Sequence, residues 1–304
     1  MRDFRSYLLI GLKGMGMGAA DVIPGVSGGT IAFLTGIYQE LIESIKSING
    51  KSLKLLFSGK IKEFWKAINA NFLISIATGI FISFLSLSKL MVYLMDNHPV
   101  ALWSFFFGLI VASAIHILKE VRFSISNAIA LLAGIACGVA ICLLSPAKTP
   151  DSLWFIFLCG SIAICAMILP GISGSFILLL LGKYEYMLDA LGNLHIPVII
   201  IFMVGALIGL VLFSRLLSWL MKHYYQIAIS VLSGIMIGSL VKVWPWQRLF
   251  ESGISWPTLP FGDGVAVSGH IPDAVIFAAL GCMLVFILEL LAKRTTKKNN
   301  FSHK

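Results

Sequence analysis

Two short runs rich in proline, glycine and serine interrupt the apolar sequence of this chain. Residues 21–30 read DVIPGVSGGT, and residues 167–176 read MILPGISGSF. Proline removes a backbone donor from a helix and glycine allows a sharp turn, so each run predicts a break in a helix. The predicted break residues are Pro24, Gly25, Pro170 and Gly171. In lipid, such a break is tolerated only where protein or a water-filled cavity satisfies the freed backbone groups.

The residues that follow each break could bind an anion. A half-helix that starts there would point its free N–H groups and the positive end of its dipole into the membrane interior. Glycine lets a ligand approach the backbone, and hydroxyl side chains add donors. The predicted phosphate-binding residues in the two runs are Ser27, Gly28, Gly29, Thr30, Ser173, Gly174 and Ser175. Two such runs meeting tip to tip would form a nearly symmetric cradle for a phosphate or a carboxylate. The alternative interpretation is that the small residues merely permit close helix packing and that proline marks a kink.

Few charged residues lie in the apolar segments. Lys89 and Arg215 occupy matching positions in the two halves of the chain. Each either contacts the phosphate and guards its path, or extends to the interface to reach water. Asp21 is the only acid near either run, and two roles stay open for it: it caps the broken helix, or it binds a coupling proton or sodium ion. Glu40 and Glu43 are interpreted as part of a solvated face. No catalytic residue, metal site or cofactor is predicted.

The composition requires lipid as the solvent. The chain has 304 residues, of which 58% are hydrophobic and 12% are charged, and its mean hydropathy is +0.94. The apolar runs are continuous rather than alternating, which favours an all-α integral membrane protein. The predicted membrane-spanning helices are 70–95, 99–118, 125–145, 196–220, 225–243 and 273–292. The net charge of +9 comes from basic residues in loops and tails that flank these runs. That placement is typical of membrane topology signals and does not indicate a nucleic-acid partner.

The chain contains an internal repeat. Pro24 and Pro170 lie 146 positions apart, and the residues after them match at the same spacing. Further along the spacing becomes 126, as between Gly79 and Gly205, because the first half has a longer loop. Each half is predicted to hold one motif segment followed by three spans. The two repeats are residues 1–146 and 147–304, and their motif segments are 5–45 and 153–190.

The positive charges predict the orientation of the chain. If the first motif segment enters and returns on one side, the N-terminus and the lysine-rich loop 43–69 share that side, which the positive-inside rule makes cytoplasmic. Each motif segment is then a re-entrant helical hairpin. Three crossings per repeat make the two repeats inverted, the usual plan of secondary transporters, and put both termini in the cytoplasm. For the second motif segment a broken full crossing stays open as the alternative.

At these residues the sequence resembles a known family. AADVIPGVSGGT followed by LTGIYQELIESI, and LPGISGSFILLLLGKYEYML in the second half, resemble the bacterial polyprenyl-phosphate transporters, the PopT-type undecaprenyl-phosphate translocases. The resemblance spans nearly the whole chain. It implies a flippase that returns undecaprenyl phosphate from the outer to the inner leaflet of the bacterial cytoplasmic membrane, for recycling in envelope glycan synthesis. The implied partners are undecaprenyl phosphate and bilayer lipid, and a homo-oligomer is left open.

The main rival interpretation is an enzyme. Membrane undecaprenyl-pyrophosphate phosphatases also carry re-entrant hairpins, with a Pro-Gly-x-Ser-Arg-Ser motif. Gly28 and Gly174 stand where that motif has arginine, and a glutamate-rich partner motif is absent from this sequence. The charges needed for phosphoryl transfer are therefore missing. A secondary transporter of another anion is the remaining alternative.

Overall fold

The structure of the chain is a computed structural model that describes residues 3–21, 27–144, 149–249, 255–261 and 270–301. Its helices are α1 (Phe4–Asp21), α2 (Gly28–Leu34), α3 (Tyr38–Lys46), α4 (Gly50–Phe57), α5 (Ile61–Ala67), α6 (Ala70–Asn97), α7 (Pro99–Leu118), α8 (Ile125–Leu143), α9 (Leu153–Ile168), α10 (Gly174–Leu180), α11 (Tyr184–Gly192), α12 (Ile196–His223), α13 (Tyr225–Val243) and α14 (Ile271–Phe301). The strands β1 (Gln247–Leu249) and β2 (Ser255–Pro257) form one antiparallel pair.

Apolar composition accounts for the long helices. Among the described residues, α7, α8, α12 and α13 are each long and apolar enough to cross a membrane. The pair α5 and α6 passes the same test together, but is bent by 69° at its joint. Leu207, Leu212 and Leu216 of α12 are more than half exposed, as expected for a surface solvated by lipid. The chain is therefore a helical, multi-pass membrane protein.

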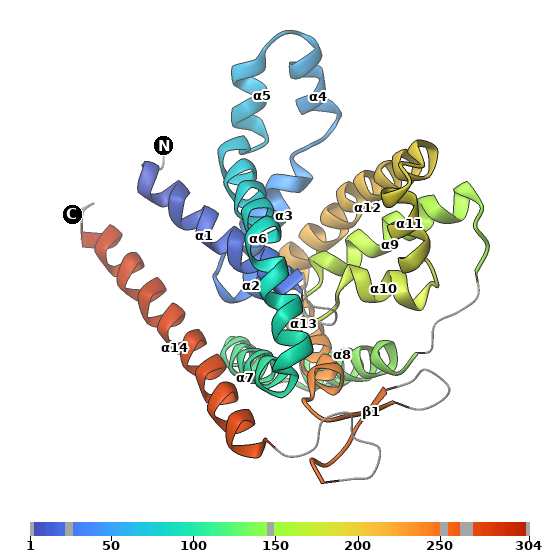
Figure 1. Cartoon of the computed structure of the whole chain (residues 1–304). Coiled ribbons are helices and arrows are strands. Elements are labelled where there is room, and N and C mark those ends of the chain that lie inside the picture. Colours follow the sequence, from blue (N-terminus) through green and yellow to red (C-terminus); the bar gives the residue numbers. More distant parts are fainter. Residues whose placement is uncertain (1–2, 22–26, 145–148, 250–254, 262–269, 302–304) are drawn as a thin grey trace.

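Each predicted span coincides with one long helix, namely α6, α7, α8, α12, α13 or α14. The loop 43–69 is less irregular than expected, because it contains α4 and α5. Asn49 begins α4 with a capping box, in which its side chain accepts from the backbone N–H of Ser52 while the Ser52 hydroxyl accepts from the backbone of Asn49. In Figure 1, the α4–α5 pair projects from one end of the molecule and the β1–β2 pair lies at the opposite end.

Both motif segments are built as a longer helix, a short half-helix and a third helix. In the second half, α9 ends at Ile168 and α10 begins at Gly174. Pro170 and Gly171 lie in the interruption, and Gly171 has a left-handed φ of +89°, which glycine adopts without strain. In the first half α1 ends at Asp21 and α2 begins at Gly28. The predicted break residues Pro24 and Gly25 lie outside the described residues.

The third span of each half packs against the second span of the other half. Within each half the long motif helix packs against the first span, as α1 against α6 and α9 against α12. The second and third spans instead pack across halves, as α7 against α14 and α8 against α13. Helices α7 and α13 also contact each other. A buried apolar cluster crosses the boundary between the halves and includes Ile10, Phe72 and Ile229. Neither half therefore closes its own core.

Equivalent glycines make equivalent close contacts in the two halves. A Cβ added at Gly79 would lie 2.0 Å from the carbonyl oxygen of Gly11, and one added at Gly205 would lie 2.1 Å from that of Phe157. Gly79 and Gly205 are 126 positions apart, and Gly11 and Phe157 are 146 positions apart. These are the two spacings of the sequence repeat. Small residues let the paired helices approach to backbone contact, as is common in membrane helix packing.

Candidate functional site

The two interrupted segments meet inside the protein. The hydroxyl of Ser27 lies 3.1 Å from the carbonyl oxygens of both Met167 and Leu169, where it can donate to either. The backbone N–H of Gly171 donates to Oγ1 of Thr30 over 2.9 Å. Ser27 and Thr30 are fully buried. The hydroxyls of the first motif therefore satisfy backbone groups of the second, which a break inside a membrane protein requires.

The start of α2 already holds a negative group. The backbone N–H of Gly28 donates to a carboxylate oxygen of Asp21 over 2.7 Å. The N–H of Gly29 donates to the hydroxyl of Ser27 over 3.0 Å, and the N–H of Thr30 to the Ser27 carbonyl over 3.0 Å. An acid at a helix N-terminus is stabilised by the free donors and by the dipole. The carboxylate of Asp21 thus occupies the place at which the sequence predicts a bound anion.

The start of α10 is built differently. Met167 stands where the repeat has Asp21, and its side chain would lie 2.5 Å from a Cβ added at Gly174. The hydroxyls of Ser173 and Ser175 are hydrogen-bonded to each other at 2.8 Å. The N–H groups of Gly174 and Ser175 have no acceptor among the residues that the structure describes. The two half-helices are therefore equivalent in position but not in charge.

Of the two cations predicted to contact the phosphate, Lys89 and Arg215, the structure describes the side chain of Arg215 alone, and that side chain makes no polar contact with this junction. Arg215 is exposed, on the same stripe of α12 as Leu212 and Leu216, and it makes no hydrogen bond or ion pair to the described part of the chain. The side chain of Lys89 lies outside what the structure describes. A cation not selected from the sequence lies closer to the second motif: Nζ of Lys242 is 4.9 Å from the ring centre of Phe176 in α10. The sequence feature that could have identified Lys242 is its position as a lysine within an apolar span.

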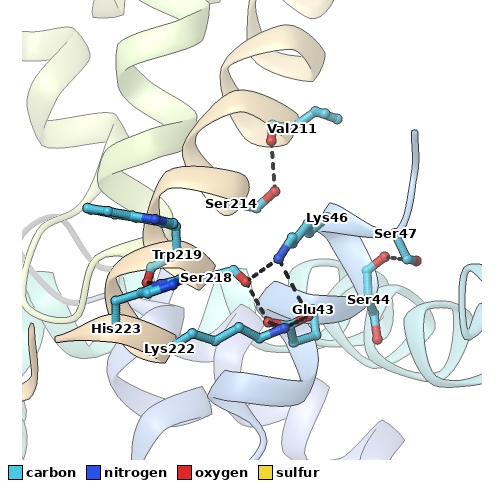
Figure 2. Close-up of polar contacts among 10 residues, drawn as sticks. All are labelled: Glu43, Ser44, Lys46, Ser47, Val211, Ser214, Ser218, Trp219, Lys222 and His223. Carbon is cyan, nitrogen blue, oxygen red and sulfur yellow. Dashed lines mark hydrogen bonds and ion pairs between the residues drawn. The ribbon is translucent and has the colours of Figure 1, made fainter. Parts of the chain in front are cut away.

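A polar network joins α3 to α12 (Figure 2). A carboxylate oxygen of Glu43 accepts from the hydroxyl of Ser218 over 2.5 Å, and Nζ of Lys46 donates to the same hydroxyl over 2.7 Å. Nζ of Lys222 lies 3.4 Å from both carboxylate oxygens. Burial raises the pKa of Glu43, but the Ser218 hydrogen bond and the charges of Lys46 and Lys222 outweigh it and hold this pKa below its usual range.

The interpretation of Glu40 and Glu43 as part of a solvated face is incomplete. Both acids are partly exposed, yet Glu43 also belongs to the contact between the two halves, and Glu40 accepts a hydrogen bond from the side-chain amide of Asn69 over 3.0 Å. The α3 helix has the charge pattern of a surface helix. Ser218, Lys222 and Asn69 lie far from it in the sequence, on α12 or beside α6, so no local pattern indicates these partners.

An ion pair between the buried Lys183 and the exposed Asp151 ties together the two ends of the second motif segment. Lys183, 2% exposed, extends its Nζ to within 2.6 Å of a carboxylate oxygen of Asp151 and 2.8 Å of the carbonyl of Thr149. The hydroxyl of Thr149 donates to the carbonyl of Leu181. Residues before α9 and residues after α10 are therefore adjacent. Sequence analysis missed this lysine, whose position in the first repeat is occupied by Ile37.

In the part of the chain that the structure describes, no group of three or more histidine, cysteine or acidic side chains could hold a metal ion. The site is instead made of backbone N–H groups, hydroxyls and one carboxylate, in a surrounding of apolar helices. Such groups can exchange one anionic oxygen ligand for another, because N–H and O–H groups donate to a phosphate oxygen as they do to a carboxylate oxygen.

Comparison with known proteins gives relatives over most of the chain. Residues 17–256 match the family described as undecaprenyl phosphate translocase-like. A polyprenyl-phosphate transporter of Vibrio cholerae serotype O1 is 44% identical over 261 residues, which are 86% of this chain and 83% of that protein. A polyprenyl-phosphate transporter of Staphylococcus aureus is 33% identical over 253 residues, which are 77% of this chain and 85% of that protein. No solved structure matches.

Proposed function

This chain belongs to the undecaprenyl phosphate translocase-like family, and from that premise we propose that it is a flippase for polyprenyl phosphate. The proposed direction is from the outer to the inner leaflet of the bacterial cytoplasmic membrane, which returns the lipid carrier to envelope glycan synthesis. Both relatives carry the name of a transporter and not of an enzyme. The main observation behind the proposal is the buried contact between the two Pro-Gly-x-Ser-Gly motifs.

The proposed phosphate site is that meeting point. At α10, the N–H groups of Gly174 and Ser175 have no acceptor among the described residues. In the hydrogen-bonded pair of Ser173 and Ser175 one hydroxyl donates to the other, which leaves a second O–H to donate to a phosphate. At α2, the N–H groups of Gly28 and Gly29 can donate to a phosphate only when their present acceptors, the Asp21 carboxylate and the Ser27 hydroxyl, move away. A phosphate that binds there displaces the carboxylate of Asp21 or requires it to take up a cation. This exchange would couple substrate binding to a proton or to a sodium ion at Asp21.

The proposed architecture is an inverted repeat of two re-entrant hairpins, each followed by three spans. Two contacts support it. The ion pair of Lys183 with Asp151 brings the start and the end of the second motif segment together, as a hairpin requires and a full crossing does not. The exchange of α8 and α14 between the halves is what a two-fold axis in the membrane plane would generate.

Arg215 and Lys89 are proposed as guides and not as ligands in the cradle. Arg215 lies beside the exposed Leu212 and Leu216, so its guanidinium can meet a headgroup that arrives from lipid. In an inverted repeat, Lys89 would take the equivalent position at the other leaflet. Both termini and the loop 43–69 are proposed to be cytoplasmic, since they carry most of the positive charge.

The test is leaflet-specific detection of undecaprenyl phosphate in proteoliposomes with and without the protein. We expect the protein to accelerate the loss of undecaprenyl phosphate from the outer-leaflet pool that an added phosphatase can reach. Empty liposomes and liposomes that contain an unrelated membrane protein are the controls. Equal rates in all three preparations would contradict the proposal. Release of inorganic phosphate by the purified protein alone would instead indicate an enzyme.

A further inference from the structure

The short helix α5 turns sharply away from the first long span. Its axis makes an angle of 69° with that of α6. If α6 crosses the membrane, α5 lies nearly in the plane of the membrane surface. It carries Ile61 and Trp65, which are 60% and 42% exposed, together with Lys62 and Lys66. Apolar and basic side chains on one short helix in this orientation are typical of a segment that rests on a lipid surface.

The joint between α5 and α6 is fixed by specific contacts. Asn69 has a left-handed φ of +51°, which asparagine tolerates better than most residues. Its side-chain amide donates to Glu40 over 3.0 Å and to the hydroxyl of Ser44 over 3.1 Å. Across the joint, the indole N–H of Trp65 donates to the side-chain oxygen of Asn71 over 2.7 Å. The angle is therefore set by hydrogen bonds to α3 and α6.

A pocket of about 420 Å³ lies inside this joint. Two lysines line it, Lys62 and Lys66, one helical turn apart on α5, and Tyr7 of α1 lines it from another side. Neither lysine has an ion pair or hydrogen bond with a described residue, whereas the acid Glu63 on the same helix pairs with Lys60 at 3.4 Å. Like charges at this spacing repel each other, and an anion placed between them would remove the repulsion.

We propose that this pocket binds the phosphate headgroup of an anionic phospholipid. Charge complementarity selects an anion, and the two ammonium groups with the side-chain NH₂ of Asn71 supply donors suited to phosphate oxygens. The half-exposed Trp65 at the mouth is the kind of residue that anchors proteins at the headgroup level. The occupant is therefore a lipid whose chains run along α6 while its phosphate enters the pocket.

The site has no counterpart in the second half of the protein. There α11 is followed directly by α12, whereas α4 and α5 separate α3 from α6 in the first half. The pocket consequently faces one leaflet only. Its residues are separate from the two Pro-Gly-x-Ser-Gly motifs at 21–30 and 167–176, so the proposal does not depend on the transported substrate.

The test compares lipid binding by the full-length protein and two matched variants. Lys62→Gln/Lys66→Gln removes the two charges of the pocket. Lys51→Gln/Lys54→Gln removes two charges from α4, the helix that precedes α5. We expect the first variant to bind a short-chain phosphatidylglycerol at least tenfold more weakly than the parent protein. The second variant should bind it within about twofold of the parent, and Lys62→Arg/Lys66→Arg should restore most of the affinity.

Four outcomes would overturn the proposal. Equal losses in the two Gln variants would indicate diffuse surface attraction and no pocket. Equal binding of short-chain phosphatidylcholine would exclude recognition of an anion. Equal binding of inorganic phosphate would assign the site to a free ion. Tighter binding of a short-chain polyprenyl phosphate, lost in the same pocket variant, would place the pocket on the substrate path instead.

Discussion

Gly29 stands where the two motifs leave no room for a side chain. A Cβ at this position would lie 2.4 Å from the carbonyl oxygen of Ile168, which is backbone and cannot turn aside. At Gly174 a Cβ would lie 2.5 Å from Cγ of Met167, which is flexible, and 2.7 Å from the carbonyl oxygen of Ala163, which is backbone. At Gly192 a Cβ meets nothing within 4 Å. We expect Gly29→Ala to lower the free energy of unfolding by about 1–3 kcal/mol and to abolish transport.

The same series contains its own controls. Gly174→Ala should also impair transport, because Met167 can change rotamer but the carbonyl oxygen of Ala163 cannot turn aside. Gly192→Ala should behave like the parent protein. The larger Gly28→Val and Gly174→Val should both abolish transport while the protein still inserts into the membrane. Thermal unfolding in detergent and transport normalised to protein level are the measurements. Full transport by Gly29→Ala would show that the motifs separate freely.

Asp21 allows its two proposed roles to be distinguished. Asp21→Asn keeps an oxygen that accepts from the N–H of Gly28 but removes the charge, whereas Asp21→Ala leaves that buried donor unpaired, at a cost of about 1–3 kcal/mol. If the carboxylate only caps α2, the Asn variant transports like the parent. If it couples transport to an ion, the Asn variant keeps its thermal stability but loses the dependence of its rate on a pH or sodium gradient.

At the residue scale the sequence predicted which groups would form the junction but not how they bond. The repeated Pro-Gly-x-Ser-Gly spacing is local, so it could be read directly. The contacts of Ser27 with Met167 and Leu169 join residues about 140 positions apart, and they depend on how α2 packs against α9. No local pattern encodes that packing. Capping of the broken helix was one of the two roles that the sequence left open for Asp21, and the hydrogen bond from the N–H of Gly28 is the contact that this role requires.

At the scale of elements, the network between α3 and α12 is a contact that can open. Glu43 is partly exposed, so its ion pairs are worth at most about 1 kcal/mol. We expect Glu43→Gln to leave overall stability nearly unchanged and to increase hydrogen exchange at the backbone of α3. Lys60→Gln, which breaks a pair within α5, is the matched control and should leave α3 unchanged.

The pH dependence of this contact has a definite sign. The pKa of Glu43 is lowered in the folded protein, so the stabilisation is complete above the usual carboxylate pKa and is lost as pH falls through the lowered value. The protection factor of α3, which corrects exchange for its intrinsic dependence on pH, should therefore be constant around neutral pH and fall only in acid. A fall near neutral pH would show that another group controls the contact.

Short helices escaped prediction where long ones did not. The apolar runs of the spans extend over many residues, and composition alone marks them. Helices α4 and α5 have 8 and 7 residues and mix lysines with apolar side chains, a pattern that a solvated loop shares. What makes them helices is the cap at Asn49 and the joint at Asn69, and the second of these depends on contacts with α3.

At the scale of the whole molecule, the two ends of each motif segment should lie on one side of the membrane. In a Cys-less background, cysteines at Asp151 and Asp189 should both be labelled by an impermeant reagent from outside, and a cysteine at Lys54 only from inside. The adjacency of Asp151 and Lys183 is the physical reason. Labelling of Asp151 and Asp189 from opposite sides would mean that the second motif segment crosses fully.

The exchanged packing also predicts how the halves behave when separated. Fragments 1–146 and 147–304 each lack the partner of their second and third spans. We expect each fragment alone to be degraded, and the two expressed together to assemble and to restore transport. Stable accumulation of either fragment alone, measured by its half-life in membranes, would contradict this dependence.

The pairing of α7 with α14 and of α8 with α13 has a consequence for synthesis. The chain leaves the ribosome from its N-terminus, so α7 and α8 enter the membrane long before either partner exists. Their contact faces, which carry Gly108 on α7 and Gly134 and Gly138 on α8, must remain in lipid or against the insertion machinery until α13 and α14 arrive. The order in which helices are inserted thus differs from the order in which they pack. A truncated nascent chain would leave these helices without their partners, so we expect membrane chaperones to bind it and quality-control proteases to degrade it.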